Sequence, residues 1–248
     1  MRKEEQKMLK SFIQYIVGMA EPHIQNIEGE TYSDKQLHRI KHIPYANEIR
    51  MNTLSSLIDY IKSGVDSFSG TMIIHVQSPT CVSMYSALDV ERNRENVVEV
   101  RANVPEFDFN RFMDHEAFCI GVQSKFIDHP GTDKALLLKF AGTVEAGSVA
   151  EYGDDGISQK ATVKTGIASK GEAIVPSPAF LKPFRTFVEV EQPCSSFIFR
   201  MKDDKYKGGI QCALYEADGG AWKISAMEAI KAYLTEALKE YSGFIIIS

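Results

Sequence analysis

The side chains best suited to chemistry surround a short glycine-bearing stretch, residues 166–171. Backbone N–H groups of such a loop, together with ammonium and guanidinium groups, can hold an anion such as a nucleotide phosphate. The sequence therefore predicts an anion-binding surface. Its expected ligand-binding residues are Lys160, Lys164, Lys170, Lys182 and Arg185.

The same basic residues also have a purely structural interpretation. Lys160 and Lys164 share the polar face of one predicted strand. Glu189 and Glu191 share the polar face of another. Ion pairs between adjacent strands would then account for the lysines, and exposed pairs of this kind contribute little to stability. Both interpretations remain open at the level of sequence.

A second cluster combines carboxylates with imidazoles, the ligands that a hydrolytic metal site would need to bring together. Acidic residues are equally typical of helix starts, and Asp128 to Gly131 has the composition of a turn. We expect cap and turn roles, with a metal-dependent hydrolase using Asp108, Asp114, His115 and Asp128 as the alternative. The whole cluster comprises Asp108, Asp114, His115, Glu116, Asp128 and His129.

Other signatures of catalysis are absent from the sequence. It contains no phosphate-binding P-loop, dinucleotide fingerprint, zinc-protease motif or serine-hydrolase elbow. Its four cysteines are far apart, which is typical of small core residues in a reducing compartment rather than of a zinc knuckle. We therefore expect a non-enzymatic protein with no catalytic residue, no metal and no cofactor. The cysteines are Cys81, Cys119, Cys194 and Cys212.

Composition limits the range of partners. The 248 residues include 44% hydrophobic and 25% charged side chains, as in an ordinary globular protein, and the formal net charge is −5. An acidic chain does not coat a phosphate backbone, so any binding to nucleic acid requires a local basic patch. No apolar run approaches about 20 residues and no secretion signal is evident, so we expect neither a membrane span nor export.

Apolar periodicity predicts the helices that position these residues. We expect helices at residues 4–20, 53–63, 132–141 and 225–241, the last opened by a capping box of Ser225 with Glu228. A further helical stretch is expected from about Asp108 to residue 126, with a second start at Asp114. Its phenylalanines are expected to be core residues rather than stacking platforms for bases: Phe107, Phe109, Phe112, Phe118 and Phe126.

Alternating patterns predict the strands. Residues 71–104 are expected to form a three-stranded meander, and the apolar tail at 244–247 to pair with a sheet edge in this subunit or a neighbour. Three amphipathic strands in the back half are expected to form one antiparallel sheet, at 160–165, 184–190 and 197–201. The fold class is therefore α+β with mainly antiparallel sheets, divided into an N-terminal helix and arm (1–47) and a single α+β domain (48–248).

Six segments of the chain carry a resemblance to a known family: 76–80, Asp108–Phe112, Tyr152–Gly156, Ser158–Gly166, Arg185–Val190 and Glu216–Trp222. With these segments the chain resembles the YfdQ-like family of phage and prophage proteins. The resemblance covers about three-quarters of the chain and implies a phage or prophage origin and the cytoplasm of an infected or lysogenic bacterium. It carries over no catalytic or ligand-binding residue.

The sequence therefore predicts a non-enzymatic phage protein that binds an anionic ligand, either a nucleotide or single-stranded nucleic acid. A role early in infection is expected, in counter-defence or in support of recombination or replication. The apolar tail and unpaired strand edges predict a homo-oligomer. The alternative is a self-assembling structural protein without a small ligand.

Overall fold

Most of the chain is described by the computed structural model. The described residues are 2–20, 22–36, 45–68, 70–149, 160–164, 170–174, 177–203 and 209–248. They belong to two units, Met1–Tyr45 and Ala46–Ser248, and each is described by itself. Within the described residues, no helix has the length and apolar content that crossing a bilayer requires.

The first unit contains one helix and one hairpin. The predicted N-terminal helix is confirmed as α1 (Arg2–Ala20). The predicted connecting arm contains an antiparallel hairpin of β1 (Ile24–Ile27) and β2 (Glu30–Ser33). Glu28 and Gly29 form its two-residue turn with φ values of 55° and 86°, the left-handed conformation that such a turn requires.

The second unit contains a five-stranded sheet that confirms the predicted meander. Its three central strands are antiparallel neighbours, and one parallel strand is added at each edge. The predicted pairing of the apolar tail with a sheet edge is confirmed, and it occurs within this subunit. In sheet order, the strands are β14 (Phe244–Ile247), β4 (Met72–Ser78), β5 (Cys81–Ser86), β6 (Asn96–Arg101) and β3 (Ile49–Met51).

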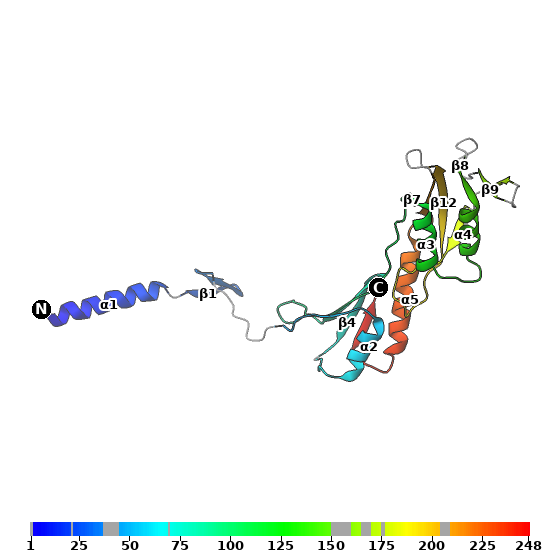
Figure 1. The fold of residues 1–248 in the computed structure, drawn as a ribbon. Helices are drawn as coiled ribbons and strands as arrows, with labels where there is room; N and C mark the ends of the chain where they lie inside the picture. The colour runs from blue at the N-terminus through cyan, green and yellow to red at the C-terminus, as the bar shows by residue number, and fades with distance from the viewer. Residues whose placement is uncertain are drawn as a thin grey trace. The chain divides into compact units, whose positions relative to one another are not determined.

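Two helices, α2 (Leu54–Ser63) and α5 (Ala221–Ala237), cover one face of this sheet (Figure 1). The Thr53 hydroxyl accepts a hydrogen bond from Ser56 N at 3.2 Å and starts α2, as predicted. The alternating apolar residues of β4 to β6 meet the apolar stripes of both helices. The resulting core includes Leu57, Ile61, Ile74, Met84, Val100, Ile230 and Leu234.

A four-stranded antiparallel sheet forms a second core with α3 (His115–Lys125) and α4 (Lys134–Thr143). The predicted role of the phenylalanines in the core is confirmed for Phe118 and Phe126, which are buried, and for Phe107 and Phe109, which pack against them. In sheet order, the strands are β11 (Ala179–Leu181), β12 (Ser195–Asp203), β13 (Ile210–Glu216) and β7 (Met113–Asp114).

A third, separate sheet holds the lysine-bearing strand. Its order is β10 (Lys170–Ile174), β9 (Lys160–Lys164) and β8 (Val144–Val149), all antiparallel. The register places Lys164 opposite Lys170. Among the described residues of the second unit, three sheets with mostly antiparallel pairing, packed helices and a C-terminal helix and strand confirm the predicted α+β class.

The expected single sheet in the back half is wrong. Residues 184–191 form no strand; they make a loop between β11 and β12. Phe187 and Val190 of this loop are buried in the core of the five-stranded sheet, whereas Val188 is 71% exposed. Burial along the loop therefore does not follow the alternating pattern that indicated a strand, since Phe187 and Val190 are three positions apart.

Two predicted helix starts also require correction. No helix begins near Asp108, because residues 107–112 are irregular and the first helical turn follows Asp114. The C-terminal helix begins at Ala221, after Gly220, rather than at a capping box formed by Ser225. Ser225 instead lies inside α5, where its hydroxyl donates to Ala221 O at 3.4 Å.

Candidate anion-binding pocket

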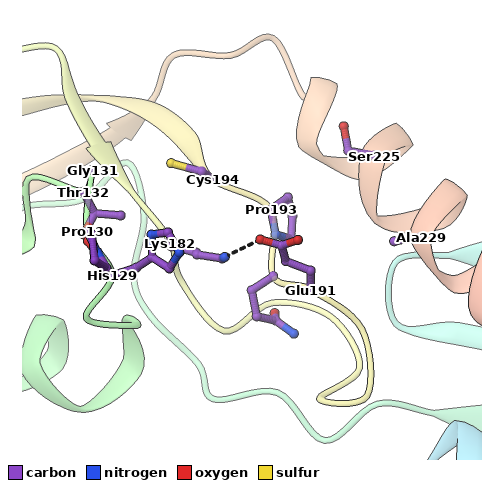
Figure 2. A pocket seen from close by; sticks show the side chains of 11 residues that line it. His129, Pro130, Gly131, Thr132, Lys182, Glu191, Pro193, Cys194, Ser225 and Ala229 are labelled. Atoms are coloured by element: carbon purple, nitrogen blue, oxygen red, sulfur yellow. Dashed lines mark hydrogen bonds and ion pairs between the residues drawn. The ribbon is translucent and has the colours of Figure 1, made fainter.

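One cavity of the second unit combines a buried cation with two hydroxyl groups and one imidazole (Figure 2). Its volume is about 490 Å³. Its walls come from the turn between α3 and α4, the end of β11, the loop before β12 and the first half of α5. The lining residues are His129, Pro130, Gly131, Thr132, Lys182, Glu191, Gln192, Pro193, Cys194, Ser225 and Ala229.

The turn between α3 and α4 has a fixed shape. Gly131 has a φ of 90°, a conformation that glycine adopts without strain. Thr132 closes the turn, since its N–H and its hydroxyl both donate to His129 O, at 3.1 and 2.8 Å. Asp133 then anchors the turn to β11: it exchanges backbone and side-chain hydrogen bonds with Phe180 at 2.8 and 2.7 Å.

Lys182 supplies the positive charge of the pocket. Its side chain is only 9% exposed, and its Nζ lies 2.7 Å from Glu191 Oε1. Figure 2 shows this pair at the pocket wall. The hydrogen bond from Lys182, with its charge, lowers the pKa of Glu191, and His129 adds a smaller effect in the same direction. The Glu191 side chain is 80% exposed, so the pair joins a buried cation to a carboxylate on the solvent side.

The loop that carries Glu191 is held by the buried side chain of Gln192. Gln192 Oε1 accepts from Arg185 N at 2.9 Å and from Thr186 N at 3.1 Å. Its Nε2 donates to Phe187 O at 2.8 Å. One amide side chain thus replaces the strand ladder that this segment lacks, and it satisfies backbone groups that burial would otherwise leave without partners.

Arg185 has a different environment from Lys182 and does not line the pocket. Its guanidinium lies 4.0 Å from the centre of the Trp222 ring and donates to Glu216 at 3.2 Å and to the Ser195 hydroxyl. Burial lowers the pKa of Arg185 to about 10, an effect that the charge of Glu216 opposes. Arg185 therefore connects its loop to β13 and to the start of α5.

The remaining predicted ligands lie in the third sheet. Lys160 and Lys164 are in β9 and Lys170 is in β10, and their side chains lie outside the described part of the structure, as do residues 165–169. Of the five predicted residues, the described structure places only Lys182 in the pocket.

The expected cross-strand pairing with Glu189 and Glu191 is wrong in its geometry, because the neighbours of β9 are β8 and β10. Glu189 instead accepts from Ser55 N at 3.2 Å, and Glu191 from Lys182.

The residues considered as metal ligands have local structural roles. Asp114 caps α3, as its helix-start signal predicted, and accepts from Glu116 N at 2.9 Å. His115 Nε2 lies 2.9 Å from Ala141 O. Among the residues that the structure describes, no group of three or more His, Cys, Asp or Glu side chains is placed to hold a metal ion.

Several pocket residues were not identified from the sequence as anion ligands. His129 was assigned to a turn, which is correct, but its place beside Lys182 depends on the packing of α4 against β11. Cys194 was expected to be a core residue and is instead exposed at the pocket. Ser225 and Ala229 come from α5, a distant part of the sequence, and no local signal connects them to the turn at His129.

Comparison with known proteins yields no relative. No protein-family model matches the chain, and no curated protein and no solved structure is significantly similar to it.

Proposed function

We propose that this protein binds a small anionic ligand, such as a nucleotide phosphate, in the pocket around Lys182, and that it does so without transforming the ligand. The observation that carries the proposal is the Lys182–Glu191 pair. A lysine ammonium with a 9% exposed side chain needs an anionic partner, because burying an unpaired charge is costly. Its present partner is the carboxylate of Glu191, whose side chain is 80% exposed and can rotate into solvent.

Ligand binding is then an exchange of one anion for another. An entering phosphate takes the place of the Glu191 carboxylate at Lys182 Nζ and forms charge-assisted hydrogen bonds with it. His129 adds an imidazole that can donate a hydrogen bond at the same cavity, whereas the hydroxyl protons of Thr132 and Ser225 are already donated to His129 O and Ala221 O. The volume of about 490 Å³ lies within the range of about 300–1,000 Å³ typical of small-molecule sites, which favours a nucleotide over a polymer.

Single-stranded nucleic acid remains the second anionic ligand, and the third sheet supports it. The backbone register places Lys164 opposite Lys170, which brings two of the predicted basic residues to the same pair of strands. Replacing Lys160 and Lys164 together with Glu tests this surface separately from the pocket.

The test is calorimetric titration at low salt with inorganic phosphate, a nucleoside triphosphate and a short single-stranded oligonucleotide. Lys182→Met keeps the length of the aliphatic stem but removes the charge, and we expect it to abolish nucleotide binding. Lys239→Met is the matched control, since the Lys239 side chain is 60% exposed and pairs with Glu236 outside the pocket. Absence of binding by the unmodified protein, or unchanged affinity after Lys182→Met, would contradict the proposal.

The biological setting proposed for this activity is the cytoplasm of a bacterium carrying the phage or prophage, early in infection, as in counter-defence or support of recombination or replication. The resemblance to YfdQ-like proteins supports this setting. Appearance of the protein before the structural proteins of the particle, followed over an infection or an induction, is the expected result. Its first appearance late in the cycle would contradict an early role.

The second candidate function is that of a self-assembling structural protein. Both candidate functions include a homo-oligomer. The supporting observation is β14, an edge strand whose Ile245 and Ile247 are 53% and 42% exposed. Exposed apolar edges favour pairing with another chain. Static light scattering on the purified protein measures the assembly directly, and a chain that stays monomeric at high concentration would exclude this candidate.

A further inference from the structure

The N-terminal helix α1 presents an apolar face of unusual width. Successive residues of a helix are about 100° apart around its axis, so positions in the sequence convert directly into positions around the helix. From Met8 onward, the large apolar side chains fill a continuous arc of about 200°, centred on Ile16. The opposite arc is polar, with Lys3, Lys7 and Gln14 near its centre. The apolar arc includes Leu9, Phe12, Ile13, Tyr15, Ile16 and Val17.

Within the first unit, no described residue covers this face. The large apolar residues of α1 from Met8 to Met19 are all at least half exposed, from 50% at Ile16 to 73% at Met8. An aromatic side chain buries roughly 150–250 Å², so Phe12 and Tyr15 alone expose on the order of 200 Å². The complete arc thus offers an area comparable to the roughly 800 Å² that each partner buries in a specific interface.

Helical structure in this segment requires a partner. Most helix stability in proteins comes from packing of an amphipathic face and not from intrinsic propensity, and α1 is amphipathic over its 19 residues. Ile13, Ile16 and Val17 are β-branched, which lowers the intrinsic helix propensity of the second half further. The burial that stabilises α1 must therefore come from outside the hairpin that follows it.

We propose that the α1 helices of three or more copies of this chain pack together as a bundle. A two-helix seam uses a stripe narrower than about 100°, whereas a helix in a bundle contacts two neighbours and buries a wider face. An arc of about 200° matches the second case and leaves the lysine-bearing arc in solvent. The apolar arc of α1 is thus the surface through which the proposed homo-oligomer forms. Its role does not depend on the pocket at Lys182.

Charge favours further copies of the chain over an anionic lipid surface as the occupant. Between residues 2 and 20 there are four basic and two acidic residues, whereas the rest of the chain has 24 basic and 31 acidic residues. An anionic bilayer that attracts α1 would therefore repel the bulk of the protein. A bundle buries the apolar arc without that repulsion.

Light scattering coupled to size-exclusion chromatography of the full chain tests the bundle with a matched pair of variants. Ile16→Glu places a charge at the centre of the apolar arc, and Gln14→Glu adds the same charge near the centre of the polar arc. We expect the unmodified chain and Gln14→Glu to have a mass of at least three chains, and Ile16→Glu to be monomeric. Ile16→Leu, which preserves the apolar surface, should retain the assembly.

Other outcomes overturn the inference. A monomer or dimer for the unmodified chain would mean that α1 is covered in another way, by its own chain or by one helix. An assembly that survives Ile16→Glu would place the interface elsewhere, for example at β14. Co-sedimentation of a monomeric chain with phosphatidylglycerol vesicles would assign α1 to a lipid surface. Nucleotide titration of Ile16→Glu separates these failures from failure of the pocket, which this substitution leaves intact.

Discussion

At the scale of single residues, the pocket depends on a competition between Glu191 and an external anion for Lys182. Glu191→Gln removes the competing charge but keeps the size of the side chain. We expect this variant to bind inorganic phosphate several-fold more tightly than the unmodified protein, measured by calorimetry. Glu236→Gln removes a carboxylate that pairs with Lys239 outside the pocket and should leave phosphate affinity unchanged. Weaker binding by Glu191→Gln would show that Glu191 helps to hold the ligand.

The same competition has a defined pH dependence. The pKa of Glu191 is lowered by Lys182, so the ion pair contributes to stability above the ordinary carboxyl pKa and is lost as pH falls through the lowered value. Protonation frees Lys182, and affinity for sulfate, which keeps its charge in acid, should therefore rise only below that ordinary pKa. Titrations across this range check the expectation, and Glu191→Gln should lack this rise.

Gln192 is the residue whose loss should most disturb the pocket wall. Gln192→Ala leaves two buried N–H groups and a buried carbonyl without partners, and unsatisfied groups of this kind cost about 1–3 kcal/mol each. Partial relaxation of the loop reduces the sum, so we expect a loss of about 2–4 kcal/mol in the free energy of unfolding, measured by urea denaturation. Gln123→Ala, at an exposed position of α3, should have almost no effect.

What the sequence could predict at this scale depends on whether a residue's role is local. Asp114 was recognised as a helix start because a cap involves only the next three residues. Lys182 was found as a basic residue near a glycine loop, but its burial follows from a loop fold that no local pattern encodes. Arg185 looked like a surface cation, because its contacts with Trp222 and Glu216 are long-range.

At the scale of elements, the loop of residues 184–191 connects the two cores of the second unit. Phe187 is 1% exposed in the core of the five-stranded sheet, whereas its neighbour Val188 is 71% exposed. Phe187→Ala should therefore cost about 3–5 kcal/mol, the usual range for removing a buried phenylalanine. Val188→Ala should cost close to nothing. Equal effects of the two substitutions on the urea midpoint would show that the loop does not dock as described.

Periodicity predicted the elements well where the alternation reflects a sheet surface. The meander of β4 to β6 and the strands β12 and β13 each present apolar residues to a helix layer. The same alternation failed at residues 184–191, where the loop buries Phe187 and Val190 but exposes Val188, so burial does not follow the period of two that the sequence indicates. The helix expected from Asp108 failed for a related reason: Phe107 and Phe109 pack on the second core from an irregular segment.

At the scale of the whole molecule, the α+β class could be predicted from the order of periodic segments, but the grouping of the described strands of the second unit into three sheets could not. Strands that are consecutive in sequence can belong to different sheets. Strands β8, β9 and β10 form one sheet, whereas β11 belongs to another sheet with β12, β13 and the short β7. The pocket lies where the α3–α4 turn, the loop before β12 and α5 meet. Its position therefore follows from this grouping and not from any contiguous motif.

The distribution of buried residues leads to a final expectation about the complete chain. Every buried apolar residue among those described belongs to the second unit, and no described residue of the first unit is buried. A fragment of residues 46–248 keeps both cores, and we expect it to unfold cooperatively with the thermal midpoint of the full chain. Because it lacks α1, it should also be monomeric at concentrations at which the full chain assembles.

The fragment should retain the phosphate affinity of the full chain, since every residue that lines the pocket lies within it. Calorimetry and light scattering on the same preparation therefore separate the two activities. A markedly lower midpoint for the fragment would mean that α1 covers its own second unit, in which case the bundle does not form. Loss of phosphate binding with an unchanged midpoint would instead mean that assembly through α1 completes the pocket, which would make ligand affinity rise with protein concentration.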